Sequence, residues 1–151
     1  MMAASGAAQV PSKVTLEQLA AHDLAFDAIE AGGDMQLYLE AHRSAEGWLD
    51  RIHPSGKTLL RCAVDHSRHG DISALVKAGA SPLVPDLYGM NPVHAAAALG
   101  DTTALLAILA ALPSDGPRAP SEVVHAVDQE GSTPLHKAAG SGSVAAVAAL
   151  L

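Results

Sequence analysis

The chain has few aromatic side chains: one Trp, one Phe and two Tyr among 151 residues. Apolar residues nonetheless make up 49% of the sequence, and much of that content is alanine. Alanine is the best helix former, but its small side chain fills a thick core poorly. The composition therefore argues against a sandwich or a barrel and favours thin layers of closely packed helices.

Cysteine and long apolar runs are scarce as well. The single cysteine, Cys62, excludes an intrachain disulfide and suits a reducing compartment, the cytoplasm or the nucleus. No run of 18 apolar residues occurs, so no membrane-spanning helix is expected. The N-terminal stretch MMAASGAAQVPSK lacks the basic start and the apolar core of a signal peptide, and we expect residues 1–13 to form a flexible tail.

Basic residues are outnumbered by acidic ones. The chain has 9 Lys and Arg against 16 Asp and Glu, for a formal net charge of −7. This balance argues against nucleic acid or an anionic membrane surface as the main partner. It fits a soluble protein with a basic partner.

One sequence frame occurs three times. It reads GKTLLRCAVDHS at 56–67, GMNPVHAAAALG at 89–100 and GSTPLHKAAGSG at 131–142. A second apolar run follows each copy, at 71–80, 101–112 and 143–151. A short repeated unit of two helices, stacked on its neighbours, is typical of solenoid proteins.

The spacing of the copies locates an insertion. Thr58 and Asn91 are 33 residues apart, whereas Asn91 and Thr133 are 42 apart. The nine extra residues fall in PSDGPRAPSEVVH (113–125), which contains three prolines and a glycine. Such a composition predicts a surface insertion. Whether it extends a binding rim or has no role stays open.

With its period of 33 residues, the chain resembles the ankyrin repeat family. The resemblance rests on Asp86–Gly89, Asp128–Gly131, Gly79–Ala80 and the signature Thr133–Pro134–Leu135–His136. The signature is Asn-Pro-Val-His at 91–94 and Thr-Leu-Leu-Arg at 58–61, which lacks both the proline and the histidine. The resemblance covers about residues 50–151. It implies an all-α, ankyrin-like helix-loop-helix repeat solenoid with short β-turn or hairpin loops.

This frame divides the chain into repeats. We expect repeats at 53–85, at 86–127 with the insertion, and at 128–151, where the last one is truncated. Residues 14–52 read as a degenerate N-terminal repeat whose two helices are separated by Gly32 and Gly33. One face of a terminal repeat is exposed to solvent, because no neighbouring repeat covers it. The expected polar cover consists of Glu17, Gln18, His22, Asp23, Glu30 and Asp34.

The frame also has a direct physical interpretation. Thr133 suits an N-cap and Pro134 the first helical position, where a missing N–H costs nothing, and Asn91–Pro92 repeats the arrangement. Small side chains let neighbouring first helices approach closely; they are Ala63, Ala96, Ala97, Ala138 and Ala139. Apolar residues at helical spacing form the expected core of the second helices: Leu75, Val76, Leu105, Ile108, Leu109, Val147 and Leu150.

Structural roles account for the histidines and the cysteine. His94 and His136 lie three residues after Asn91 and Thr133, so each side chain can bond back to that residue, and the resemblance implies the same role. His66 and His69, flanked by acids, are an alternative metal or enzyme site, but zinc needs three or four convergent ligands and Gly70 predicts a turn there. Cys62 reads as a buried thiol.

No phosphate loop, dinucleotide fingerprint or nucleophile elbow occurs in the sequence. We therefore expect no enzymatic activity, no catalytic residue, no metal and no cofactor.

A binding surface is predicted instead. In ankyrin-like proteins the loop tips and the exposed side of the first helices form a concave surface. Here it carries Lys57, Asp65, His66, Leu87, Tyr88, Met90, Leu99, Gln129, Glu130 and Ser132. Exposed apolar side chains with an aromatic among them are typical hot spots. The alternative is that Leu87 and Met90 pack against neighbouring loops. Nearby acids, Asp86, Asp128 and Glu130, favour basic residues in the partner.

The sequence thus predicts protein–protein recognition, as an adaptor or scaffold, with a protein partner of unknown identity. Because the chain stops inside the second helix of the last repeat, we expect it to be part of a longer protein. The alternative is that the face with Val147, Leu150 and Leu151 makes the chain self-associate. Tyr88→Ala should weaken binding while leaving the fold intact.

Overall fold

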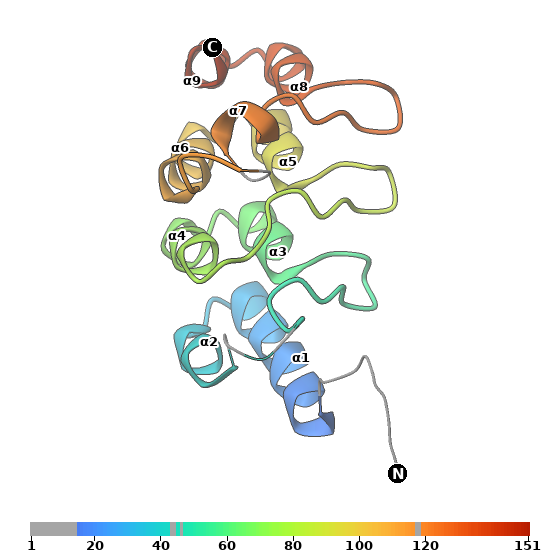
Figure 1. The fold of residues 1–151 in the computed structure, drawn as a ribbon, viewed down its shortest axis with the longest axis vertical. Coiled ribbons are helices and arrows are strands. Elements are labelled where there is room, and N and C mark those ends of the chain that lie inside the picture. Colours follow the sequence, from blue (N-terminus) through green and yellow to red (C-terminus); the bar gives the residue numbers. More distant parts are fainter. Residues whose placement is uncertain (1–14, 43–44, 46, 117–118) are drawn as a thin grey trace.

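The computed structural model describes residues 15–42, 45, 47–116 and 119–151, and this part of the chain is helical without a strand. The predicted tail at 1–13 lies outside the described residues. Helix pairs follow one another along the long axis of the molecule (Figure 1). The helices are α1 (Leu16–Ala31), α2 (Gln36–His42), α3 (Leu59–Asp65), α4 (His69–Lys77), α5 (Pro92–Leu99), α6 (Thr102–Ala111), α7 (Pro120–Val123), α8 (Pro134–Ser141) and α9 (Val144–Leu150).

The pairs form two rows. Helices α1, α3, α5 and α8 make one row, and α2, α4, α6 and α9 make the other (Figure 1). Within the rows, α1 packs on α3, α3 on α5, α5 on α8, α4 on α6 and α6 on α9. Three loops project from the first row on the side away from the second. We call their tips finger 1 (53–57), finger 2 (86–90) and finger 3 (128–132). The predicted all-α solenoid of helix-loop-helix repeats is confirmed.

Side-chain caps start the helices of the first row. The backbone N–H of His136 donates to Thr133 Oγ1 at 3.4 Å, and the backbone N–H of Thr133 donates to His136 Nδ1 at 3.0 Å. Asn91 and His94 form the same reciprocal pair at the start of α5. The predicted caps, and the predicted role of both histidines in bonding back to them, are confirmed.

The core runs without a break through the stack. Four of the five predicted alanines are buried, but Ala139 is exposed, because no described element packs over it. In the second row the predicted core residues Leu75, Val76, Leu105 and Ile108 are buried, while Leu109, Val147 and Leu150 are half-buried.

The N-terminal pair departs from the prediction at His22. This residue was expected among the polar cover, yet its side chain is fully buried. Its ring meets Trp48 edge-on at 5.5 Å, and Arg51 Nη1 lies 3.1 Å from its Nδ1. The prediction was wrong here because Trp48, which precedes finger 1 and is itself fully buried, packs against this face of α1 and donates its Nε1–H to Gln18 O at 2.9 Å.

The insertion at 113–125 is only partly a surface segment. Residues 113–116 are exposed, as predicted, but Ala119 and Val123 are 4% and 0% exposed, and Val123 belongs to the continuous core. Prolines and a glycine marked the segment as irregular. Helix α7 nevertheless buries one apolar side chain, which anchors the insertion to the stack.

Candidate partner-binding surface

The three fingers share one turn. In each, the first residue donates its backbone N–H to the carbonyl of the fifth: His53 to Lys57 at 2.8 Å, Asp86 to Met90 at 2.9 Å and Asp128 to Ser132 at 3.0 Å. The fourth residue is a glycine with φ between +77° and +87°. This left-handed conformation favours glycine. In fingers 2 and 3 the aspartate Oδ1 also accepts two backbone N–H groups inside the turn, which fixes the tip.

Neighbouring fingers are joined to one another. Gln129 donates its backbone N–H to Tyr88 O at 3.2 Å and its side-chain Nε2 to Leu87 O at 3.0 Å. A Cβ atom at Gly89 would lie 2.8 Å from the Gln129 nitrogen, so the two backbones touch. The Leu87 side chain lies against Gly56 in finger 1. The three tips therefore form one rigid row.

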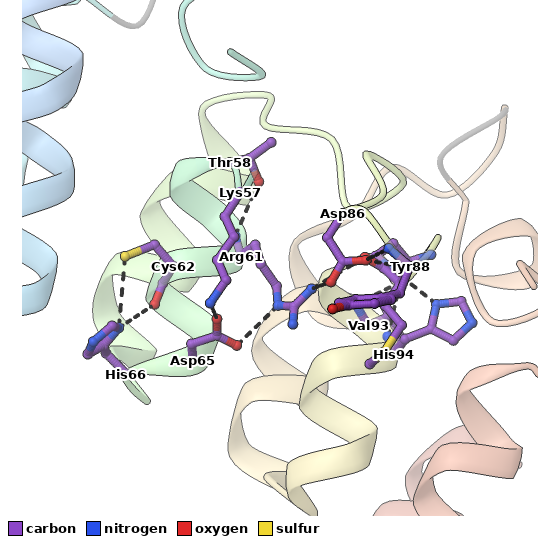
Figure 2. A network of polar contacts seen from close by, with 12 residues as sticks. Lys57, Thr58, Arg61, Cys62, Asp65, His66, Asp86, Tyr88, Val93 and His94 are labelled. Atoms are coloured by element: carbon purple, nitrogen blue, oxygen red, sulfur yellow. Dashed lines mark hydrogen bonds and ion pairs between the residues drawn. The ribbon is translucent and has the colours of Figure 1, made fainter. Parts of the chain in front are cut away.

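The first-row helices also hold the fingers. Arg61 Nη1 donates to Asp86 Oδ2 at 2.6 Å and to Met90 O at 3.4 Å, so α3 is bonded to finger 2 (Figure 2). At the same position of the frame in α5, His94 Nε2 bonds Ser132 O at 2.9 Å in finger 3. Burial lowers the pKa of His94 and keeps its ring neutral. Because Nδ1 accepts from Asn91, the proton resides on Nε2 and is donated to Ser132.

Most charges on the surface are neutralised within the protein. Lys57 and Arg61 both pair with Asp65, at 2.5 and 3.1 Å. Asp128 accepts hydrogen bonds from the Ser132 and Glu130 backbone and from Lys137, at 3.0 Å for the last, and these bonds lower its pKa to about 2. Asp86 and Asp128 were expected to attract a basic partner. Both are already paired, and the Glu130 side chain is the exposed acid of the set, 79% accessible.

The predicted surface residues fall into two groups. Leu87, Tyr88 and Leu99 are exposed, at 76%, 70% and 57%, and so are His66, Gln129 and Glu130. The half-buried ones are Lys57, Asp65, Met90 and Ser132.

Four of the ten predicted residues line one hollow of about 260 Å³ between fingers 2 and 3. Its lining residues are Tyr88, Met90, Asp128, Gln129, Glu130 and Lys137. Lys57 lies in finger 1, Asp65 ends α3 and His66 follows it, and none of the three lines the hollow. The volume lies below the roughly 300–1,000 Å³ of small-molecule sites, so it suits a single side chain of a larger ligand.

Comparison with known proteins adds to this geometry. No protein-family model matches the sequence, and no curated protein sequence matches it. Among solved structures, the crystal structure of the ankyrin repeat domain of Bcl-3, described as a unique member of the IkappaB protein family, superposes with a TM-score of 0.61 and 26% sequence identity. The match covers 88% of this chain and 50% of that chain. The chain has the ankyrin-repeat fold.

This chain therefore spans about half the length of the Bcl-3 domain that it matches. The ankyrin-repeat fold shared with this neighbour suggests a protein–protein interaction module. In the ankyrin frame, Lys137 occupies the place of Cys62 and Ala95, which are buried. Nothing in the sequence therefore indicates that Lys137 lies beside the hollow, whereas the structure places it in the lining, with Nζ 3.0 Å from Asp128 Oδ2.

His66 and His69 do not come together to form the alternative metal or enzyme site. The His66 Nδ1 lies 3.0 Å from Cys62 O, on its own helix (Figure 2), whereas His69 Nε2 bonds Asp101 at 2.9 Å. Across the described ranges, no group of three or more His, Cys, Asp or Glu side chains could hold a metal ion. Burial raises the pKa of the Cys62 thiol to about 12, which leaves it protonated and a poor nucleophile.

None of the helices that the structure describes combines the length and the apolar character needed to cross a membrane.

Proposed function

We propose that this chain is a protein–protein recognition module, an adaptor or scaffold in a reducing compartment, that binds its partner through the finger row and the adjoining side of α3, α5 and α8. The proposed repeat units are those expected from the sequence, with each finger at the start of a unit. The proposed contact residues are Lys57, Asp65, His66, Leu87, Tyr88, Met90, Leu99, Gln129, Glu130 and Ser132.

The observation that carries the proposal is the exposure of Tyr88 and Leu87 on a rigid backbone. Large apolar side chains that stay exposed to water on a loop tip are unfavourable, and burying them against a partner lowers the free energy. Here the backbone that carries them is held in place by the hydrogen bonds from Gln129 to Tyr88 O and Leu87 O. A surface that is ordered before binding loses little conformational entropy when the partner arrives.

The test compares wild type with Tyr88→Ala in partner capture and in thermal unfolding. We expect binding to weaken by about tenfold or more, as for a hot-spot aromatic. Because Tyr88 is 70% exposed, the melting temperature should stay within about 3 °C. Leu37→Ala removes a similarly exposed apolar side chain from α2, in the other row, and should leave binding unchanged. Unfolding of Tyr88→Ala, or equal binding by all three proteins, would contradict the proposal.

A further inference from the structure

The hollow between fingers 2 and 3 has the chemistry of a site for one cationic side chain. We propose that it receives an arginine from an extended segment of the protein partner, with the guanidinium group against the Tyr88 ring and paired with the Glu130 carboxylate. This inference rests on the proposed function, because it names the partner chemistry that the finger surface recognises.

The charges of the lining leave one negative charge uncompensated. Asp128 and Glu130 contribute two carboxylates and Lys137 one ammonium group. Lys137 Nζ is 3.0 Å from Asp128 Oδ2 but 3.5 Å from Glu130 Oε1. The ammonium group is thus closer to the buried aspartate, whose other oxygen is occupied by the backbone of finger 3. Glu130 is left as an exposed carboxylate, and one incoming positive charge neutralises the hollow.

Arginine fits this lining better than lysine does. A planar guanidinium stacks on an aromatic face and pairs with a carboxylate in the same plane, whereas an ammonium group is a compact, strongly hydrated charge. The aromatic ring and the carboxylate line the same hollow, because Tyr88 and Glu130 are the third residues of the adjacent fingers 2 and 3. The thioether of Met90 completes an apolar wall for the methylene groups of the arginine.

The surroundings of the hollow favour an extended segment. Gln129 bridges the two tips through Tyr88 O and Leu87 O, so the distance between the walls is fixed before the ligand arrives. Leu87, beside finger 1, is an exposed apolar contact for a residue that flanks the arginine. A chain laid along the finger row can place one side chain in the hollow and the next apolar one on Leu87.

The experiment selects peptides from a random display library against the whole chain. We keep the peptides that shift the amide NMR signals of Tyr88 or Glu130. Arginine should be enriched at one position. Replacing that arginine by citrulline, which keeps the shape and removes the charge, should weaken binding by about 3- to 10-fold in fluorescence anisotropy.

Variants of the protein then test whether the guanidinium group of the peptide pairs with Glu130. In Glu130→Gln the advantage of the arginine peptide over the citrulline peptide should shrink to the part that the Tyr88 ring supplies, whereas Glu40→Gln, which removes an exposed carboxylate from α2, should preserve the full difference. Selection against Glu130→Lys should enrich Asp or Glu in place of arginine.

Two outcomes would overturn the inference in different ways. Peptides that shift the finger signals without an arginine preference, or whose citrulline loss is unchanged in Glu130→Gln, would remove the arginine site and leave the proposed function standing. If no selected peptide shifts the finger signals, the proposed function fails and the inference fails with it.

Discussion

Arg61 on α3 and Asp86 in finger 2 form an ion pair of 2.6 Å that joins one layer of the stack to the next. Their side chains are only 13% and 10% exposed. Burial opposes the ionised form of Asp86, but the bonds from Arg61 and from the backbone of Tyr88 and Met90 outweigh it and lower the pKa of that carboxyl group. The pair therefore remains charged at neutral pH.

Removing the cation should destabilise the stack. Arg61→Ala leaves Asp65 and Asp86 without this partner in half-buried positions, and we expect a loss of about 2–4 kcal/mol in the free energy of urea unfolding. Lys57→Ala, which breaks a pair whose lysine is 38% exposed, should cost about 1 kcal/mol or less. Equal losses in the two variants would show that the link from α3 to finger 2 does not stabilise the stack.

The two signature histidines provide a matched comparison. His94 is fully buried and bonds Ser132 in the next finger, whereas His136 is exposed and bonds only within its own cap. His94→Ala should cost about 2–4 kcal/mol in denaturant unfolding, since it leaves a cavity and a carbonyl without its donor. His136→Ala should cost about 1 kcal/mol. Similar losses would mean that the bond to Ser132 contributes little.

The sequence was sufficient to predict the first-row helices. Thr133 and Pro134 determine where α8 begins because a cap and a proline act within one turn of chain, and the recurrence of the frame carried the prediction to Asn91 and α5. Tyr88 and Leu87 could be assigned to an exposed tip for the same reason, since Asp86 and Gly89 define the turn that presents them.

Contacts between distant parts of the chain were not predictable in this way. His22 is polar by type, and nothing near it in the sequence indicates that Trp48 will cover it. Val123 is hidden in a proline-rich segment whose composition indicates a loop. The bridging role of Gln129 depends on the separation of two fingers, a distance that is set by helix packing and is not encoded in either finger.

Two finger glycines should respond differently to alanine. Both have a positive φ, +77° at Gly89 and +79° at Gly131, which costs an alanine about 1–2 kcal/mol. At Gly131 a Cβ meets open space, but at Gly89 it would lie 2.8 Å from the backbone nitrogen of Gln129. Gly89→Ala should therefore lose about 3 kcal/mol or more in thermal or urea unfolding and should shift the NMR signal of the Gln129 amide. Gly131→Ala should show only the smaller loss, and an equal response at both positions would contradict the close contact.

His22 should make stability depend on pH. Burial and the nearby Arg51 charge lower its pKa from 6.5 to about 4. Between pH 6.5 and pH 4 the unfolded chain therefore binds a proton at His22 that the folded chain does not bind. The contribution of His22 to the free energy of unfolding is complete above this range and decreases as the pH falls through it. We expect a loss of about 2 kcal/mol between pH 7.5 and pH 5 in urea unfolding, followed by Trp48 fluorescence.

The control for this pH effect replaces the titrating ring. His22→Gln should lose less stability than wild type over the same pH interval, whereas His125→Gln, at an exposed histidine, should follow wild type. If His22→Gln shows the same pH dependence as wild type, the effect arises from another group, such as His94, whose pKa is also lowered by burial.

The bonds from Arg61 to Met90 and from His94 to Ser132 each connect one layer only to the layer after it. In such a row, stabilisation spreads from neighbour to neighbour and weakens with distance. A ligand held on fingers 2 and 3 should therefore slow amide hydrogen exchange most in α5 and α8 and progressively less toward α1. The direction of that gradient would reveal which end of the stack a partner holds.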